Sequence, residues 1–230
     1  MQLIILCGGL ATRLRPISKN IPKSMIMIKG KPFLWHQLEL VKKHDIYDVI
    51  LCVGYLANQI KDYFKDGKEI GMNIKYSEEK EPLGTAGALK NAEQLLDEEF
   101  LVINGDSYLM FDYNKIINYF KNKNKLALMV IYKNNNKYDN SNVSINKDLI
   151  KQYNRKTQTP EMIYIDAGLN IFKKEVLKLI PVNTKIMLDD IFEKLIEQKQ
   201  LMAYETFQRF YEIGSFEGLK EFEKLIEDKQ

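Results

Sequence analysis

Near its N-terminus the chain reads LIILCGGLATRLRP, residues 3–16, and a Pro22-Lys23 pair follows shortly after. The apolar residues 3–7 predict a buried strand, and the glycines and arginines after them predict a loop. Glycines let backbone N–H groups approach an anion closely, and the arginines would neutralise its charge. We interpret this stretch as a phosphate-binding loop. A tight turn with solvated arginines is the alternative, because a short glycine motif alone is weak evidence.

The composition is that of a globular protein without an excess of one charge. The chain has 230 residues, of which 45% are hydrophobic, so one domain with a large core is expected. Its 34 basic and 31 acidic residues give a net charge of +3, which offers no case for nucleic-acid binding. No apolar run approaches membrane-spanning length, so no membrane partner is expected. Cys7 and Cys52 lie in apolar runs and are predicted to be buried, reduced thiols, which fits a cytoplasmic location.

Strands and helices alternate in the first half of the chain. Continuous apolar runs predict strands, and helical spacing of apolar residues predicts helices. The expected strands are residues 3–7, 49–53, 73–76 and 100–103, and the expected helices are residues 33–44, 57–64 and 85–96. This order predicts an α/β fold, with a Rossmann-like, doubly wound sheet that is mixed but mostly parallel. Ligands bind such sheets at the carboxyl ends of the strands.

The second half predicts a smaller, β-rich part. The expected strands are residues 126–132, 143–145, 149–153, 162–172, 201–205 and 209–213, and the expected helices are residues 188–198 and 216–226. Ser215 would cap the last helix. The Asn- and Lys-rich residues 133–142 predict an exposed loop. We find no internal repeat and no linker.

Three further motifs could complete a phosphate site. Residues 81–88 form a turn that opens a helix, where a flat group could lie against small residues and the helix N-terminus could hold an anion. Asn104-Gly105-Asp106 places a carboxylate at a strand tip, where it could bind magnesium, and Glu212 at another strand end could be a second ligand. The alternatives are an ordinary Pro-Gly turn, an Asx turn and an exposed strand-end glutamate.

Together these motifs predict phosphoryl chemistry that needs no protein nucleophile. A loop of donors would hold a triphosphate, a metal would bridge its oxygens, and cations would stabilise the charge as pyrophosphate leaves. The chain offers no good pair of nucleophile and base. His36 and His44 lie on an expected helix and are predicted to be packing or surface residues.

In its order of motifs the chain resembles the sugar-1-phosphate nucleotidyltransferases, the nucleotide-sugar pyrophosphorylases, over essentially its whole length. The motifs are residues 8–16 with Pro22-Lys23, residues 81–88, residues 104–106 and residues 211–215. The resemblance implies a nucleotide-diphospho-sugar transferase fold, Mg²⁺ as cofactor, and a nucleoside triphosphate and a sugar 1-phosphate as substrates. It also implies one domain, residues 1–230, with a nucleotide-binding half, residues 1–110, and a sugar-phosphate-binding half, residues 111–230. Such short enzymes often pair, but no sequence feature proves a homodimer.

The resemblance also implies the roles of individual residues. The catalytic residues would be Arg13, Lys23 and Asp106, and the metal ligands Asp106 and Glu212. The nucleotide-binding residues would be Leu6, Gly8, Gly9, Thr12, Arg13, Glu81, Pro82, Gly84, Thr85 and Gly87. The substrate-binding residues would be Lys23, Asn104, Arg155, Lys156, Asp166 and Gly168. Whether Arg155 or Lys156 contacts the sugar phosphate stays open.

The chain departs from the family pattern at three positions. Ala11 replaces the usual third glycine of the loop, which is tolerable if that residue keeps a negative φ. Ser24 replaces the second proline of Pro-Lys-Pro, and Glu212 replaces an aspartate and is longer by one methylene.

The short chain and the run NGDSY, residues 104–108, look most like bacterial heptose- or hexose-1-phosphate guanylyltransferases that supply capsule and surface-glycan assembly. GTP is therefore the favoured donor, and UTP, CTP and dTTP are alternatives. A transferase acting on a non-sugar phosphate such as phosphocholine is a second reading. Its cation pocket would use Tyr153, Tyr164 and Tyr211. A non-catalytic nucleotide-sugar-binding regulator is a third reading.

Overall fold

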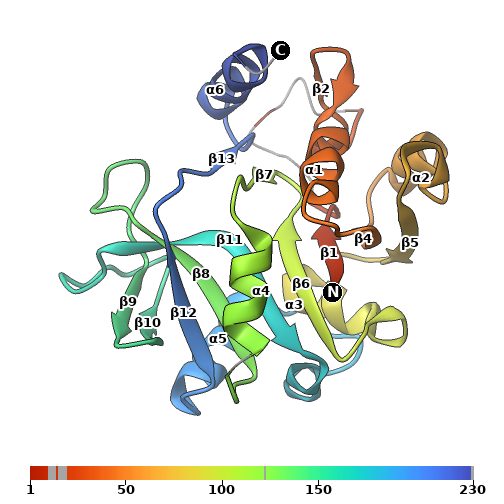
Figure 1. The fold of residues 1–230 in the computed structure, drawn as a ribbon. Coiled ribbons are helices and arrows are strands. Elements are labelled where there is room, and N and C mark those ends of the chain that lie inside the picture. The colour runs from red at the N-terminus through yellow and green to blue at the C-terminus, as the bar shows by residue number, and fades with distance from the viewer. Residues whose placement is uncertain (10–13, 15–19, 122, 229–230) are drawn as a thin grey trace.

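In the described part of the chain a nine-stranded sheet forms the centre of the fold, and helices lie on both sides of it (Figure 1). The computed structural model describes residues 1–9, 14, 20–121 and 123–228. The strand order is β5-β4-β1-β6-β11-β8-β12-β10-β9. Along the chain these strands are β1 (Gln2–Leu6), β4 (Asp48–Val53), β5 (Asn73–Glu78), β6 (Glu99–Asn104), β8 (Ala127–Lys133), β9 (Val143–Asn146), β10 (Leu149–Tyr153), β11 (Tyr164–Lys173) and β12 (Leu201–Thr206).

The two halves of the sheet differ in strand direction. Strands β5, β4, β1 and β6 are all parallel, as a doubly wound fold requires. Strand β11 is antiparallel to both β6 and β8, and β10 is antiparallel to both β12 and β9, while β8 and β12 are parallel. The sheet is therefore mixed, and the expectation that it is mostly parallel is wrong for its second half. The β9–β10 hairpin is one reason, because a tight turn can only join antiparallel strands.

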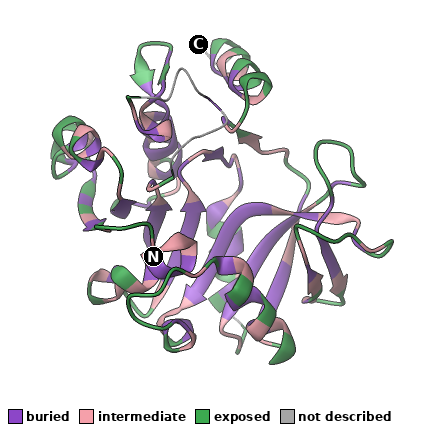
Figure 2. Cartoon of the chain, turned by 180° about the vertical axis from the view of Figure 1, so that it is seen from behind, coloured by how far each residue is buried: buried purple, intermediate pink, exposed green. Residues whose placement is uncertain are grey.

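Helices cover both faces of the sheet. Helices α1 (Phe33–Lys42), α2 (Ala57–Phe64) and α4 (Tyr113–Lys121) pack on one face, and α3 (Gly84–Asn91) and α5 (Leu188–Glu197) pack on the other (Figures 1 and 2). Successive residues of β1 point to opposite faces, so that Leu3 and Ile5 join the first core and Ile4 joins the second. Because both faces are covered, the strand reads as a continuous apolar run.

A third core joins the last helix to the first. Helix α6 (Phe216–Glu227) packs against α1, where the rings of Phe33 and Phe222 lie 5.0 Å apart. Ser215 caps α6 as predicted, because its hydroxyl accepts a hydrogen bond of 3.0 Å from the Gly218 N–H. Two short pairs of strands adjoin this core: β2 (Met27–Ile28) with β3 (Lys31–Pro32), and β7 (Ser107–Tyr108) with β13 (Tyr211–Glu212).

Two local expectations fail, and one helix was not expected. The helix expected over residues 85–96 ends at Asn91, and a 3-10 turn, Glu93–Leu95, follows it. Helix α4 was not predicted at all. Residues 133–142 are not simply an exposed loop, because Asn134 and Ser141 are 2% and 0% exposed. The Asn134 side chain donates to the Asp139 carbonyl at 2.6 Å, so polar side chains inside this segment replace contacts with water.

The remaining global expectations concern the cysteines and the membrane. Cys7 and Cys52 are free and buried, and burial raises the pKa of Cys7 to about 12, which keeps its thiol protonated. Among the described residues we find no helix with the length and hydrophobicity needed to cross a bilayer.

Candidate functional site

The predicted site lies at the edge of the sheet where β1, β4 and β6 end. Leu6 pairs with Asn104 on one side and with Cys52 on the other. The turn after β6 bends over the end of β1, since the Gly105 N–H donates to the Leu6 carbonyl at 3.0 Å. A Cβ at Gly105 would lie only 2.7 Å from that carbonyl oxygen, so this close approach requires glycine. The turn presents Asp106 above the end of the central strands.

Lys23 and Asp106 form an ion pair at this edge. Pro22 precedes a 3-10 turn, Lys23–Met25, and the Lys23 ammonium donates to Asp106 Oδ2 at 2.5 Å. The two side chains are 18% and 30% exposed, so both keep access to solvent. The fold thus brings together two of the three predicted catalytic residues, which are 83 positions apart. The third, Arg13, lies outside the residues that the structure describes, as do Ala11 and Thr12.

Glu212 reaches the same place through the short pairing of β13 with β7, in which it lies opposite Ser107. The Ser107 hydroxyl is 3.3 Å from Asp106 Oδ1 and 3.3 Å from Glu212 Oε1. One hydroxyl can donate to only one acceptor at a time. The two carboxylates therefore lie on either side of a single donor, with Lys23 as the nearby cation.

The pKa of Glu212 is raised to about 7. Loss of solvation is the main cause and repulsion by the Asp106 carboxylate adds to it, whereas Ser107, Lys23 and Arg155 oppose the shift. The Glu212 side chain is nevertheless exposed, so a ligand in solvent can reach its carboxylate. A carboxylate in such a place is well suited to contact a bound ligand.

Asp106 and Glu212 fit the binding of Mg²⁺. Oxygen ligands suit this ion, and a divalent cation between the two carboxylates would relieve their repulsion. The described part of the chain has no group of three or more His, Cys, Asp or Glu residues placed to hold a metal. The remaining ligands would therefore be water and phosphate oxygens, as is usual for Mg²⁺ at phosphate sites.

A second ion pair joins the β10 end to β11. The Arg155 guanidinium lies 3.5 Å from Asp166 Oδ2, and its Nε donates to the Tyr153 hydroxyl at 2.5 Å. The Asp166 side chain is 4% exposed, and its Oδ1 accepts from the Gly168 N–H at 2.9 Å. Burial raises the pKa of Asp166, while Arg155 and the Gly168 N–H oppose the shift. Lys156 is exposed, and its backbone N–H donates to the Asn154 side chain at 2.8 Å.

Gly168 brings β11 close to the turn that carries Asp106. Its φ is +81°, a conformation that favours glycine, and a Cβ there would lie 3.4 Å from Ser107 Oγ and 3.7 Å from Asn104 Nδ2. The pairing of β11 with β8 also shifts register between Asp166 and Asn170. The structure thus brings Asn104, Asp166 and Gly168, three predicted substrate-binding residues, to the edge that holds Asp106.

The N-terminus of α3 is occupied by the chain itself. The N–H groups of Ala86 and Gly87 donate to the Ile186 carbonyl at 3.1 and 3.2 Å. A Cβ at Gly84, whose φ is +74°, would lie 2.5 Å from the same carbonyl. The Leu188 N–H donates to the Thr85 hydroxyl at 2.8 Å. Two of the backbone donors at this helix end, those of Ala86 and Gly87, therefore already have an acceptor in the chain. The expectation that the helix end holds an anion stays a prediction.

For the predicted nucleotide-binding residues the structure gives positions only. Glu81 and Pro82 are exposed in the turn before α3, and Gly9 is exposed after β1. The expected contacts of these residues and of Leu6, Gly8, Gly84, Thr85 and Gly87 with a nucleotide stay predictions.

Sequence reasoning missed Glu79 at this edge. A Cβ at Gly8 or at Gly54 would lie 2.8 or 2.9 Å from Glu79 Oε1, and Oε2 accepts from the Leu83 N–H at 3.1 Å. Burial raises the pKa of Glu79, with the Leu83 N–H opposing. Both glycines therefore make room for this side chain, which links the ends of β1 and β4 to the turn before α3. The sequence feature that could have identified Glu79 is its position: it is a carboxylate directly after β5, at the carboxyl end of a parallel strand.

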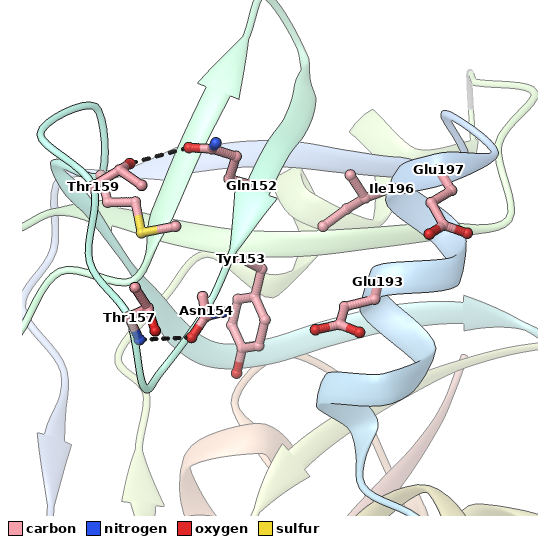
Figure 3. Close-up of a pocket in the computed structure, with 9 residues that line it drawn as sticks. Gln152, Tyr153, Asn154, Thr157, Thr159, Glu193, Ile196 and Glu197 are labelled. Atoms are coloured by element: carbon pink, nitrogen blue, oxygen red, sulfur yellow. Dashed lines mark hydrogen bonds between the residues drawn. The ribbon is translucent and has the colours of Figure 1, made fainter.

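A hollow of about 340 Å³ lies between β10 and α5, apart from the Asp106 and Glu212 carboxylates (Figure 3). Glu193 and Glu197 of α5 line one side of it, and the Asx turn between Asn154 and Thr157 lines another. Neither Asp106 nor Glu212 lines it. The candidate site is thus defined by convergent charged groups rather than by this hollow.

Known proteins match this chain over nearly its whole length. A model of the family described as "Nucleotidyl transferase" matches residues 2–229. The D-glycero-alpha-D-manno-heptose 1-phosphate guanylyltransferase of Campylobacter jejuni is 36% identical over 215 residues, which are 93% of this chain and 95% of that protein. The mannose-1-phosphate guanylyltransferase catalytic subunit beta of Xenopus tropicalis is 33% identical over 93% of this chain, which spans 61% of that protein.

Solved structures also match over nearly the whole chain. The crystal structure of HddC from Yersinia pseudotuberculosis is 27% identical, with a TM-score of 0.84 over 98% of this chain and 99% of that one. The same protein complexed with GMP-PN has a TM-score of 0.82 at the same identity and the same coverage of both chains.

Proposed function

The chain belongs to the nucleotidyl transferase family, and on that premise we propose that it transfers GMP from GTP to a heptose or hexose 1-phosphate and releases pyrophosphate. The observation that carries this proposal is the convergence of Lys23, Asp106 and Glu212 at the carboxyl edge of the sheet. The relatives that are guanylyltransferases support guanine as the base and a sugar 1-phosphate as the acceptor. Supply of surface glycans and a cytoplasmic location are part of the same proposal.

In the proposed reaction an oxygen of the sugar phosphate attacks the α-phosphorus of GTP. The bond from the α-phosphorus to the bridging oxygen breaks, and pyrophosphate leaves with that oxygen and its electron pair. Positioning and charge stabilisation are the protein's tasks in such a transfer. The Lys23 ammonium has three donors, of which Asp106 takes one, so the others can bind phosphate oxygens. Arg13 would stabilise the departing charge.

Asp106 and Glu212 would hold Mg²⁺, and the bound ion would neutralise phosphate charge. The Ser107 hydroxyl lies 3.3 Å from both carboxylates and can donate to either one of them. Lys23 offsets the negative charge of this pair before substrates arrive.

Arg155 is the proposed contact for the acceptor phosphate. Its guanidinium is anchored by Tyr153 and Asp166 on one side and keeps 53% of its side-chain surface exposed. A guanidinium held in this way can present its remaining donors to a phosphate as a fork. The Arg155 charge also opposes the rise in the pKa of Glu212, although it is the weakest of the named influences, which supports a position on the same side of the molecule as the carboxylate pair. Lys156 has no such link to the site among its described contacts.

The tyrosines weigh against phosphocholine as the acceptor. Recognition of a quaternary ammonium uses aromatic faces that are free for the ligand. The Tyr153 ring has the Arg155 guanidinium 5.8 Å from its centroid, and the Tyr211 ring has Arg209 at 4.9 Å. Two of the three candidate rings are therefore engaged by the chain's own cations. The charged residues that converge around Asp106 likewise weigh against a non-catalytic regulator.

The test is a pyrophosphate-release screen with magnesium. GTP, ATP, UTP, CTP and dTTP are each combined with heptose, mannose and glucose 1-phosphates and with phosphocholine. We expect release to be fastest with GTP and a sugar 1-phosphate and to require both substrates. Turnover with phosphocholine alone among the acceptors, or no pyrophosphate from any combination, would overturn the proposal.

A further inference from the structure

We propose that Gln37 is a positioning residue that holds the turn carrying Asp106 in its reactive geometry. This inference rests on the proposed function. Gln37 lies on α1 and is 1% exposed. Its side-chain NH₂ group donates to the Asn104 carbonyl at 2.9 Å and to the Ser107 carbonyl at 2.7 Å. These two carbonyls flank Gly105 and Asp106, so one amide spans the whole turn.

The position of Gln37 is otherwise apolar. Leu34, Leu38 and Val41 of the same helix are fully buried in the core that packs on the sheet. The Gln37 Oε1 atom is buried and has no hydrogen-bond partner among the residues that the structure describes. A buried carbonyl without a partner costs stability, and an apolar side chain of similar shape would avoid that cost. Packing alone therefore does not explain a glutamine here, whereas the two bonds to the turn do.

Helix α1 can transmit a fixed position to the turn. It packs on the sheet through the residues named above, and on α6 through the contact of Phe33 with Phe222. Backbone bonds hold the same turn from two other sides: the Gly105 N–H donates to Leu6, and the Ile213 N–H donates to the Asp106 carbonyl at 2.9 Å. Gln37 adds the side-chain support from the helix layer.

Loss of this support should move Asp106 relative to Lys23 and Glu212 without removing any charge from the site. A small displacement of a reacting group costs turnover more than it costs binding. The effect should therefore appear in kcat, while the KM values for both substrates change little. A change that merely loosened the fold would lower thermal stability and the amount of active enzyme together, and the kcat per folded molecule would stay the same.

The experiment compares Gln37→Met with Gln2→Met. Methionine keeps the length of glutamine but removes its donors. Gln2 is a matched control, because it is 6% exposed, lies at the opposite end of β1 and also bonds two backbone groups, Leu95 O at 3.1 Å and Asp97 N at 3.0 Å. For Gln37→Met we expect kcat to fall roughly ten- to a hundredfold, with KM values within about threefold of those of the unchanged protein. For Gln2→Met we expect an unchanged kcat.

Amide hydrogen exchange gives a second readout that needs no turnover. The Gly105 and Ile213 amides should exchange faster in Gln37→Met and at an unchanged rate in Gln2→Met. Gln37→Leu replaces the methionine variant if the latter does not fold. An unchanged kcat together with unchanged exchange, or equal loss of kcat in both variants, would overturn the role of Gln37. A natural-sequence protein without turnover would overturn the proposed function instead, and the exchange data would still decide on Gln37.

Discussion

Lys23 and Asp106 lie 2.5 Å apart with side chains that are 18% and 30% exposed, whereas Arg155 and Asp166 lie 3.5 Å apart with exposures of 53% and 4%. In the first pair both charges keep access to solvent, so both can contact a substrate. In the second pair the carboxylate is buried and only the guanidinium is accessible. The carboxylate of the first pair is thus placed to take part in the reaction, and that of the second is placed to orient its arginine.

Asp106→Asn should show the largest effect. Asparagine keeps the shape of the turn but removes the charge that pairs with Lys23, so kcat should fall about a hundred- to a thousandfold with little change in thermal unfolding. The matched Asp166→Asn variant should mainly raise the KM for the sugar phosphate. Steady-state pyrophosphate release measures both. Equal losses of kcat in the two variants would mean that the pairs do not differ as described.

Arg155→Ala should have an intermediate effect. Removing a charge-assisted hydrogen bond to a phosphate should raise the KM for the sugar 1-phosphate about ten- to a hundredfold, with a smaller change in the KM for GTP. Lys156→Ala, one residue further on, is the matched control and should change that KM by less than about twofold. If instead Lys156→Ala raises the KM for the sugar 1-phosphate and Arg155→Ala leaves it nearly unchanged, Lys156 is the phosphate contact.

Glu212→Gln should show the smallest effect, on stability in metal-free protein. Its folded-state pKa of about 7 lies above the ordinary 4.5, so the folded state binds this proton more tightly than the unfolded state does. Ionisation of Glu212 therefore costs stability, and the cost grows as the pH rises from about 4.5 to about 7 and is complete above that range.

The glutamine variant should accordingly be more stable than the unchanged protein at pH 8, by about 1 kcal/mol after solvent screening, and nearly equal to it at about pH 4, below the ordinary pKa of a glutamate. Urea unfolding at the two pH values, with a chelator present, measures the difference. The same stabilisation at both pH values would show that titration of Glu212 is not its cause.

The features that the sequence predicted best are the local ones. The β1 run, helix α2 and the Ser215 cap depend on neighbouring residues, and each was expected within a residue or two of its place. The strand directions of the second half depend on which distant strands meet, and periodicity carries no such information. The same is true of Ser107, whose position beside Glu212 depends on pairing across 105 residues.

Two other features were visible in the local sequence, but the residues that they contact are distant in the chain. Gln37 is a polar residue in the apolar stripe of a helix, a pattern that marks a buried amide but does not say what the amide binds. The small residues of α3 indicate a close approach, and in the structure the approaching group is the Ile186 carbonyl of the same chain. Such patterns predict that something packs there, and only the fold identifies it.

The most direct test of the central claim follows the α-phosphorus itself. GTP labelled at that phosphorus is incubated with magnesium, a heptose 1-phosphate and the protein, and the labelled products are separated. We expect the label to move into a nucleotide sugar only when the sugar phosphate is present, and not to move measurably with Asp106→Asn. Label that stays in GTP with the unchanged protein, or that moves at a similar rate with Asp106→Asn, would contradict the assignment of the reaction to this edge of the sheet.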